Sequence, residues 1–586
     1  MQKTKMVFTV GPASETEEVL SQLIEAGMSC SRHNFSHGDH AEHKARLDMV
    51  KKLREKYNKP IAIMLDTKGP EIRTHKFVNK KEELQKGETF TVYCGQEVEG
   101  DITKCSVTYA DLYKDVKPGN TILIDDGLVG LTVKEVVESE KKIICEVQNT
   151  GRVATHKGVN VPGVSIKLPA LTDKDKADLV FGCEQGVDLV AASFIRKAAD
   201  VLAIRKVLEE NGGSEIQIFS KIENQEGVDN IDDIIKFSDG IMVARGDMGV
   251  EIPLQNVPMV QKMIIEKCNK AGKPVITATQ MLDSMMRNPR PTRAEVSDVA
   301  NAIYDGTDAV MLSGESANGS YPVVAAQTMA KICQAVEENI DYVAALEKRK
   351  EAAMTNVANA ISLATCTTAM ELNAKAIITA TQTGNTAKMV SKYRPAAPVI
   401  AVTPSAIVAR KLALNFGVLP ILSEKVETTD ELIQDAVNKA KEAGCVTDGD
   451  LVVVAAGIPV HLSGSTNMLK VHVVGDVLVQ GKGMGNAHGF GNAKVVTDSS
   501  DLSNIERDDI LVVKTLDKNF VEVLDKVAGI ISEEGGLTSH LAVECVSRNI
   551  PLITNAGDAT SVIKDGTFVS MDVNRGVVYA GKANLA

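Results

Sequence analysis

The sequence lacks several features that would each mark a particular class of protein. Its 586 residues include ten cysteines, but no CxxC pair and no His-rich cluster at zinc-ligand spacing. No segment approaches the roughly 18–20 apolar residues that a membrane-spanning helix needs. Positive charge is also scarce, because 65 Lys and Arg face 77 Asp and Glu, a net charge of −12. This balance argues against binding to nucleic acid or to an anionic membrane surface.

The rest of the composition is typical of a soluble globular protein. Hydrophobic residues make up 44% of the chain and charged residues 24%. A chain of this length is expected to form about four domains of ~150 residues each. The scattered cysteines suit a reducing compartment. Because the first four residues lead straight into a strand-like run, we expect no signal peptide and a cytoplasmic location.

Short runs rich in Val, Ile and Ala alternate with helix-length amphipathic segments, which is typical of parallel strands buried on both faces. Eight such runs precede residue 346, at 5–10, 28–34, 61–66, 187–193, 216–222, 240–244, 274–279 and 308–313. Most are followed by a helical pattern. Eight strand–helix units favour a closed (β/α)₈ barrel of the TIM type, although the pattern alone leaves an open doubly wound sheet possible.

The connection after the third run is much too long for a single helix. About 100 of its 120 residues form short strand-like runs separated by turn signals such as Lys86-Gly87, Pro118-Gly119 and Asp126-Gly127. This texture predicts a small β-barrel or sandwich inserted at the mouth of the large barrel. A module in that place can act as a lid.

A second α/β region follows a charged run at 347–351. Its expected strands, at 375–380, 398–403, 450–455 and 470–474, predict an open sheet. A glycine-rich stretch at 481–491 then precedes about 100 residues that mix strands and one helix. We therefore predict an α/β protein with four domains: a catalytic barrel at 1–68 and 168–346, a β lid at 69–167, an α/β domain at 347–475 and an extra domain at 476–586.

Charged and polar residues follow the expected barrel strands at the ends where barrel enzymes hold their active sites. They are Arg32, Asn34, Ser36 and His37 after the second strand, Asp66 to Arg73 after the third, Lys221 and Glu223 at the fifth, Arg245 to Asp247 at the sixth, Thr279 at the seventh, and Ser313 to Glu315 at the eighth. Any one of these could be a local salt bridge. Their convergence at one end of one barrel favours a catalytic site.

The mixture of side chains indicates phosphate chemistry. Glu223 and Asp247 are hard oxygen donors suited to Mg²⁺. Arg32, Arg73 and Lys221 provide the positive field that a transferring phosphoryl group requires. The backbone N–H groups of Gly246 and Asp247, at the start of a helical segment, can bind an anion such as a carboxylate.

Seven strings of residues resemble those of the pyruvate kinase family, in the family's order. They are Arg32-His-Asn-Phe-Ser-His-Gly38, Leu65-Asp-Thr-Lys-Gly-Pro-Glu-Ile-Arg-Thr74, Lys221-Ile-Glu-Asn224, Met242-Val-Ala-Arg-Gly-Asp-Met-Gly249, Ala278-Thr-Gln-Met-Leu282, Arg290-Pro-Thr-Arg-Ala-Glu295 and Met311-Leu-Ser-Gly-Glu315. The resemblance covers residues 1 to about 475. It implies transfer of a phosphoryl group from phosphoenolpyruvate to ADP, giving pyruvate and ATP in the last step of glycolysis.

The resemblance also implies roles for single residues. The catalytic set is Lys221, Arg73, Arg32, Thr279 and Ser313; the set that binds phosphoenolpyruvate is Arg32, Lys221, Gly246, Asp247 and Thr279; the nucleotide set is Asn34, His37, Arg73 and Lys174. Glu223 and Asp247 would hold Mg²⁺ (or Mn²⁺), and Asn34, Ser36, Asp66 and Thr67 would hold K⁺. Glu71 resembles the residue that accompanies potassium dependence in this family. Neither Thr279 nor Ser313 is acidic enough to be a convincing proton donor to the enolate, so a relay through water is favoured and the final donor is left open.

His33 departs from the family pattern, in which Leu is usual. Because it alternates with Arg32 and Asn34 along the strand, it should face the helix layer, where a core histidine is expected rather than a catalytic base. Ser316 replaces the usual Thr. Neither change removes a functional side chain.

A loop at 379–386, between a strand and a helix, resembles the family's allosteric sugar-phosphate pocket. Its hydroxyls and N–H groups would bind a phosphorylated small-molecule effector. The expected contacts are Thr381, Thr383, Gly384, Asn385 and Thr386, with residues 463–466 as a second wall. A capped turn is the alternative. The resemblance further implies a homotetramer.

Residues 533–540 resemble the phosphohistidine segment of phosphoenolpyruvate-utilising enzymes such as pyruvate phosphate dikinase, with His540 as the phosphoryl acceptor. The alternative is a retained domain without chemistry. Two other functions remain to be weighed: a dikinase or phosphoenolpyruvate synthase that uses His540, and a barrel lyase that uses Lys221 as a Schiff base.

Overall fold

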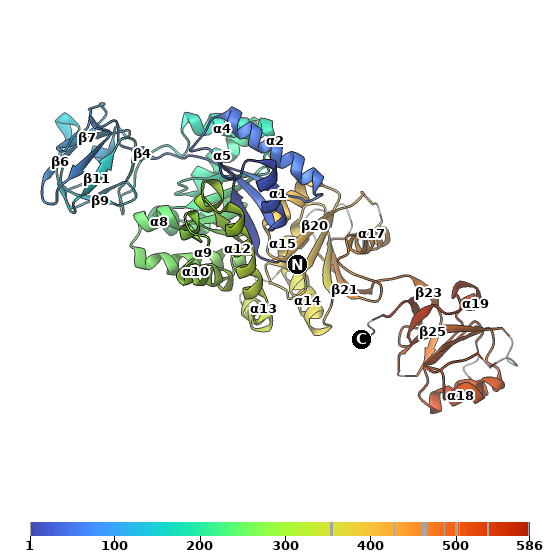
Figure 1. Cartoon of the computed structure of the whole chain (residues 1–586). Helices are drawn as coiled ribbons and strands as arrows, with labels where there is room; N and C mark the ends of the chain where they lie inside the picture. Colours follow the sequence, from blue (N-terminus) through green and yellow to red (C-terminus); the bar gives the residue numbers. More distant parts are fainter. Residues whose placement is uncertain are drawn as a thin grey trace. The chain divides into compact units, whose positions relative to one another are not determined.

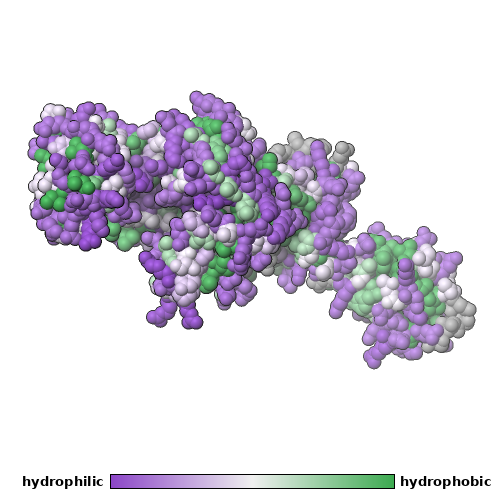
Figure 2. All heavy atoms as spheres, turned by 45° about the horizontal axis from the view of Figure 1, so that its top comes forward, coloured by the Kyte–Doolittle hydropathy of each residue, from purple (hydrophilic) through white to green (hydrophobic). Residues whose placement is uncertain are grey.

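The computed structural model describes residues 2–351, 356–426, 428–458, 466–485, 487–497, 502, 504–535, 538–583 and 585. The chain divides into two compact units, residues 1–354 with 406–420, and residues 355–405 with 421–586. No helix in the described part of the chain has the length and apolar character that a membrane crossing requires. On the face shown in Figure 2, hydrophobic residues form scattered patches on a largely hydrophilic surface.

The first unit contains a closed barrel of eight parallel strands, which confirms the predicted (β/α)₈ fold. Around the barrel the strands follow one another in the order β1-β17-β16-β15-β14-β13-β3-β2. Their bounds are β1 (Lys5–Thr9), β2 (Met28–Asn34), β3 (Ala62–Asp66), β13 (Leu189–Ala192), β14 (Gln217–Ile222), β15 (Gly240–Ala244), β16 (Val275–Ala278) and β17 (Ala309–Leu312). The open doubly wound sheet is therefore excluded.

Helices surround these strands (Figure 1). They are α1 (Glu17–Glu25), α2 (His40–Lys56), α4 (Asp173–Gln185), α5 (Ala198–Glu210), α7 (Ile231–Phe237), α9 (Val257–Ala271), α10 (Arg293–Asp305) and α12 (Pro322–Glu337). The starts of α4 and α10 are fixed by capping boxes, Thr172 with Asp175 and Thr292 with Glu295. Both faces of each strand are thus covered, which is why the strands consist largely of apolar residues.

The floor of the barrel is closed by a segment that lies far away in the sequence, α16 (Ala406–Lys411) and the 3₁₀ turn η4 (Leu412–Leu414). Ala413 and Leu414 belong to the same apolar cluster as the residues that point into the barrel. At the N-terminal ends of the strands, Phe416 N donates to Asp308 Oδ1 at 3.1 Å and Lys5 Nζ donates to the Val418 carbonyl at 2.6 Å. The barrel is therefore packed to its floor and open at the mouth only.

The inserted segment forms β-structure after β3, as predicted. Its main sheet has the order β4-β12-β8-β9-β10-β6-β7, and an isolated bridge from Thr74 to Val107 brings its two edges together. The bounds are β4 (Ile72–Arg73), β5 (Lys81–Leu84), β6 (Thr89–Cys94), β7 (Lys104–Val107), β8 (Thr121–Ile124), β9 (Val129–Val137), β10 (Lys142–Val147), β11 (Gly151–Ala154) and β12 (Gly158–Asn160), with helix α3 (Leu112–Asp115). It has a separate apolar core.

An α/β sheet follows in the order β20-β19-β18-β21-β22. Its elements are α14 (Val357–Glu371), β18 (Ala376–Ala380), α15 (Asn385–Ser391), β19 (Val399–Thr403), β20 (Val418–Leu422), α17 (Thr429–Glu442), β21 (Leu451–Ala456) and β22 (Met468–Val473). Four of the five strands match the sequence prediction. β20 was missed because Pro420 lies inside it, and proline is tolerated there because the strand lies at the sheet edge.

The last part of the chain forms an eight-stranded sheet in the order β23-β30-β29-β25-β26-β27-β28-β24. Its elements are β23 (Val477–Gln480), β24 (Lys482–Met484), β25 (Gly489–Val496), β26 (Ile510–Val513), β27 (Gly529–Ser532), α18 (His540–Ser547), β28 (Leu552–Thr554), α19 (Ala559–Val562), β29 (Phe568–Asp572) and β30 (Val577–Ala580). The prediction of a single helix was wrong, because the short helix α19 accompanies α18.

Candidate active site

Strand register gathers the predicted residues at the barrel mouth. Asn34 at the end of β2 pairs with Asp66 at the end of β3. Lys221 lies near the end of β14 (Gln217–Ile222), and Glu223 is the first residue after this strand. Asp247 lies in the first turn of helix α8 (Arg245–Glu251), which starts where β15 ends. All of these groups therefore lie at the C-terminal ends of the strands, as in other barrels of this type.

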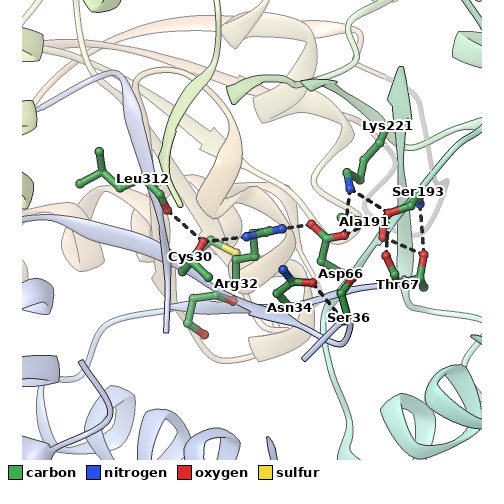
Figure 3. A network of polar contacts seen from close by, with 12 residues as sticks. Cys30, Arg32, Asn34, Ser36, Asp66, Thr67, Ala191, Ser193, Lys221 and Leu312 are labelled. Atoms are coloured by element: carbon green, nitrogen blue, oxygen red, sulfur yellow. Dashed lines mark hydrogen bonds and ion pairs between the residues drawn. The ribbon is translucent and has the colours of Figure 1, made fainter. Parts of the chain in front are cut away.

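Asp66 lies at the centre of a buried chain of charges. Its Oδ2 lies 2.6 Å from Arg32 Nε and its Oδ1 lies 3.2 Å from Lys221 Nζ. Lys221 Nζ also lies 3.0 Å from Glu223 Oε1 and donates to Ser193 Oγ at 2.8 Å. Figure 3 shows Asp66 between Arg32 and Lys221, with Ser193 beside the lysine. Two cations and two carboxylates are thus held together with almost no access to solvent.

The protonation states follow from this pairing. Burial opposes the charge of Lys221, but Asp66 and Glu223 outweigh it and raise the pKa of the lysine. Burial would likewise raise the pKa of Asp66, yet Arg32 and Lys221 hold it below its ordinary value. Lys221 is therefore an ammonium and Asp66 a carboxylate at neutral pH. An ammonium cannot attack a carbonyl carbon, which argues against a Schiff-base lyase.

Glu223 and Asp247 carry like charges in this cluster and repel each other. Burial raises the pKa of Glu223, and the negative charge of Asp247 adds to the rise against the opposing effect of Lys221. A divalent cation between the two carboxylates would remove this repulsion, so the donor set fits Mg²⁺. Within the described ranges no group of three or more His, Cys, Asp or Glu side chains gathers around such a point. The remaining ligand positions would fall to substrate oxygens and water.

The four residues predicted to bind potassium lie at the ends of the neighbouring strands β2 and β3 and in the loops that follow them. Asn34 Oδ1 accepts from Ser36 N at 3.1 Å, and Phe35 N donates to the Asp66 carbonyl at 3.0 Å. Thr67 N donates to the Ala191 carbonyl at 3.0 Å. Figure 3 shows Asn34 and Ser36 below Asp66, on the side away from Lys221. All of the side chains offer oxygen, as a hard cation requires.

Thr279 and Gly246 meet at the mouth as predicted. Gly246 N donates to Thr279 Oγ1 at 2.7 Å. Thr279 has φ +67, an uncommon conformation for a β-branched residue, and it is held by Arg245, which donates to the Thr279 carbonyl at 2.8 Å. Such strain is typical of functional sites. Ser313 Oγ is buried, and among the described residues it has no hydrogen-bond partner.

The predicted nucleotide residues are not all in the buried network. Arg73, the last residue of β4 in the inserted segment, lies 2.7 Å from Glu71. Lys174 Nζ donates to the Phe35 carbonyl at 2.9 Å and lies 2.6 Å from Asp178 Oδ2. A cavity of about 520 Å³ opens at the barrel mouth, with Arg32, Asn34, His37, Thr279 and Ser313 in its wall, whereas Arg73 and Lys174 do not line it. Its volume suits a small ligand.

Two residues were missed by the sequence analysis. Ser193 at the end of β13 donates to the Thr67 carbonyl at 2.6 Å and accepts from Lys221. Asp126, in a turn of the inserted segment, is close enough to Asp247 for that charge to raise its pKa, after the larger effect of burial. Asp125 and Asp126 both have positive φ. From the sequence, Asp126-Gly127 is interpreted only as a turn signal.

Comparisons with known proteins agree with this geometry. The family model of the pyruvate kinase barrel domain matches residues 1–326, and that of its alpha/beta domain matches residues 359–472. A pyruvate kinase from Clostridium acetobutylicum is 71% identical over 474 residues, which are 81% of this chain and 100% of that protein. The chain belongs to the pyruvate kinase family.

Other relatives extend the match to the whole chain. A pyruvate kinase from Bacillus licheniformis is 52% identical over 586 residues, 100% of both chains. A crystal structure of a pyruvate kinase from Cryptosporidium parvum has a TM-score of 0.77 and 41% identity, covering 80% of this chain and 96% of that one. Residues 505–576 match the model of the mobile domain of PEP-utilising enzymes. The activity is therefore that of a pyruvate kinase, a phosphotransferase with metal-dependent chemistry whose substrates are phosphoenolpyruvate and ADP.

Outside the barrel, the predicted effector loop joins β18 to α15. Gly384 has φ +82, and its N–H bonds to Thr381 Oγ1 at 2.9 Å. Thr386 Oγ1 lies 2.9 Å from Thr466 Oγ1. Thr383 is exposed and Asn385 half-buried. Residues 463–465 of the predicted second wall lie outside the described residues.

His540 is the first residue of α18, directly after its N-cap Ser539, and its side chain is exposed. Residues 536–537 of the predicted phosphohistidine segment lie outside the described residues. Glu533 of that segment accepts hydrogen bonds from Thr560.

Proposed function

We propose that the charged cluster at the barrel mouth carries out the transfer from phosphoenolpyruvate to ADP, with Mg²⁺ (or Mn²⁺) and K⁺ as its ions. The observation that supports this most strongly is Lys221, a buried ammonium that lies 3.2 Å from Asp66 and 3.0 Å from Glu223, beside Asp247. Phosphoryl transfer needs positioned charge more than covalent chemistry. Lys221 supplies a positive charge where negative charge moves between oxygens.

The neighbouring residues would then have distinct roles. Arg32 and Arg73 would clamp the phosphates, and Lys174, with Asn34 and His37, would hold the nucleotide. The Gly246 and Asp247 N–H groups and Thr279 would bind the carboxylate of the substrate. Ser313, whose buried hydroxyl has no partner among the described residues, is suited to hold a water in a proton relay to the enolate.

Glu223 and Asp247 would hold the divalent ion, which neutralises phosphate charge when it is bound. Asn34, Ser36, Asp66 and Thr67 would hold K⁺. Glu71, which pairs with Arg73, is a carboxylate in the position where a lysine would supply positive charge instead. We therefore expect that potassium activates the enzyme.

A coupled assay of ATP formation tests these assignments. Phosphoenolpyruvate and ADP should give ATP only when Mg²⁺ or Mn²⁺ is present, and K⁺ should raise the rate, whereas Na⁺ should do so weakly. Full activity without a divalent ion would overturn the metal assignment. A rate that does not depend on K⁺ would overturn the potassium site alone.

Further proposals concern the rest of the chain. The 381–386 loop, with Thr466 beside it, would bind a phosphorylated effector, and adding sugar phosphates or AMP to the assay tests this. The proposed enzyme is a homotetramer in the cytoplasm. Its proposed domains are the barrel at 1–68 with 168–346, the lid at 69–167, the α/β domain at 347–475 and the terminal domain at 476–586. Sedimentation in the presence of the effector checks the oligomeric state.

A second activity rests on the exposed His540 and the match to the mobile domain of PEP-utilising enzymes. In this proposal His540 accepts a phosphoryl group. Intact mass after incubation with phosphoenolpyruvate should show a phosphoryl adduct, and H540A should lack it. If no adduct forms, or if H540A still carries one, His540 is not the phosphoryl acceptor.

A further inference from the structure

Asp178 on α4 is a buried carboxylate that lies one layer behind the barrel mouth. Its side chain is 1% exposed, and both of its oxygens are used. Oδ2 lies 2.6 Å from Lys174 Nζ, one helical turn away, and Oδ1 accepts from His40 Nε2 of α2 at 2.8 Å. A buried charge with two partners fixes the positions of both, because releasing either one would leave an unpaired oxygen out of contact with water.

Lys174 is held at two of its three N–H groups. One bonds to Asp178 and another to the Phe35 carbonyl at 2.9 Å. The side chain of Lys174 remains 47% exposed, so the third N–H is available to a ligand. A free lysine has a flexible stem, and fixing it costs entropy at the moment of binding. The two protein contacts fix the ammonium in advance.

The residue whose carbonyl Lys174 contacts is packed among other rings. The Phe35 ring is stacked on His43 with centroids 3.9 Å apart, and it packs against Phe181 at 5.9 Å. Phe181 in turn is stacked on His40 at 4.3 Å. Phe35 lies between Asn34 and Ser36, two of the proposed potassium ligands. Lys174 therefore joins the proposed nucleotide site to the proposed potassium loop.

We propose that Asp178 is a positioning residue, which orients Lys174 toward the phosphates of the nucleoside diphosphate and fastens that lysine to the potassium loop. This inference rests on the proposed role of Lys174 in nucleotide binding. In this proposal Asp178 and His40 increase the affinity of the enzyme for ADP and K⁺. They do not affect its affinity for phosphoenolpyruvate.

Steady-state kinetics of D178A separate positioning from a structural role. The KM for ADP and the K⁺ concentration for half-maximal activity should each rise about 10-fold, as is typical when the partner of a ligand-binding group is removed. The KM for phosphoenolpyruvate and kcat at saturation should change little. D173N is the matched control, because Asp173 lies on the same helix with a fully exposed side chain and pairs only with Lys176 in the described structure.

D178N serves as the conservative variant and also guards against a folding defect in D178A. Asn keeps one oxygen for Lys174, and its amide can donate to His40 if the imidazole changes its tautomer. D178N should therefore restore most of the ADP affinity that D178A loses. Equal losses in D178N and D178A, or a fall in kcat with no change in the KM for ADP, would overturn positioning.

The double variant D178A/K174M distinguishes the inference from the proposed function. K174M alone should raise the KM for ADP, and D178A should add nothing to it, because Asp178 acts through Lys174. If the two effects add, Asp178 acts independently of Lys174 and the inference is wrong. If K174M leaves the KM for ADP unchanged, the nucleotide role of Lys174 fails, and the inference fails with it.

Discussion

The barrel mouth and the terminal domain both carry a side chain that can handle a phosphoryl group, but in opposite surroundings. Lys221 is buried and contacts Asp66, Ser193 and Glu223. His540 is exposed at the start of a short helix. The first site has its charges assembled in advance, as electrostatic catalysis requires. The second offers an exposed imidazole, and among the described residues no comparable buried charge cluster surrounds it.

The relatives differ in how much of this chain they match. The pyruvate kinase from Clostridium acetobutylicum matches 81% of this chain over its full length, whereas that from Bacillus licheniformis matches all of it. A 474-residue protein of the family therefore exists without a counterpart of the terminal domain. We therefore expect that the barrel and the α/β domain of this chain carry out phosphotransfer without the terminal domain.

Lys221→Met should give the largest effect in the barrel. The substitution removes the buried ammonium and leaves Asp66 and Glu223 without it, so kcat should fall by about 10³-fold. The coupled assay at saturating substrates measures this. Lys206→Met is the control, because the Lys206 side chain is 74% exposed. If K221M kept the wild-type kcat, the buried charges at the barrel mouth would not be the catalytic assembly that distinguishes this site from His540.

The packing of the barrel floor should be the next largest contributor. Leu414 is fully buried in the barrel interior, so Leu414→Ala should lower the free energy of unfolding by about 3 kcal/mol. Leu254→Ala, at a side chain that is 72% exposed, should change it by less than about 0.5 kcal/mol. Because the chain has no tryptophan, urea unfolding is followed by circular dichroism. Equal effects of the two variants would show that the floor is not packed as described.

Lys5, also at the floor, should make stability depend on pH. Burial lowers its pKa from 10.5 to about 8, against the opposing effects of Glu337 and Asp308. Between these two values the unfolded chain binds the proton and the folded chain does not, so stability rises with pH. From pH 8 to pH 10 the wild type should gain about 2 kcal/mol relative to Lys5→Met. Parallel stability curves for the two proteins would contradict this.

Removal of the terminal domain should have the smallest effect. A chain that ends after residue 475 should keep kcat/KM for both substrates within about threefold, a change of less than about 0.7 kcal/mol in the activation free energy. The full chain assayed in parallel is the reference. A loss of more than tenfold would show that the terminal domain assists the barrel site.

Much of the fold could be predicted from the sequence, because parallel strands buried on both faces have an unmistakable composition. All eight barrel strands were found, and the side chain of His33 in β2 faces the helix layer as predicted, with its ring centroid 6.4 Å from that of His43 in α2. β20 escaped because of Pro420. The floor segment around Leu414 could not be predicted, since an apolar run carries no information about which distant strands it packs against.

The candidate site was predicted less completely. Charged residues such as Lys221 and Glu223 could be identified because the hydrophobic core of a barrel does not require buried charges. Ser193 did not, since a serine at the end of a strand is common and its value depends on the contact with Lys221. Asp178 was equally hidden, because its importance comes from a pairing between two helices.

Binding of Mn²⁺, followed by electron paramagnetic resonance, tests most directly whether the buried charges at the barrel mouth form one metal and phosphoryl site. Glu223→Gln should weaken Mn²⁺ binding by about 10- to 100-fold. Glu226→Gln, three residues further along the chain and bonded to Ser165, should leave it unchanged. Equal Mn²⁺ affinity in the wild type and in E223Q would contradict the account.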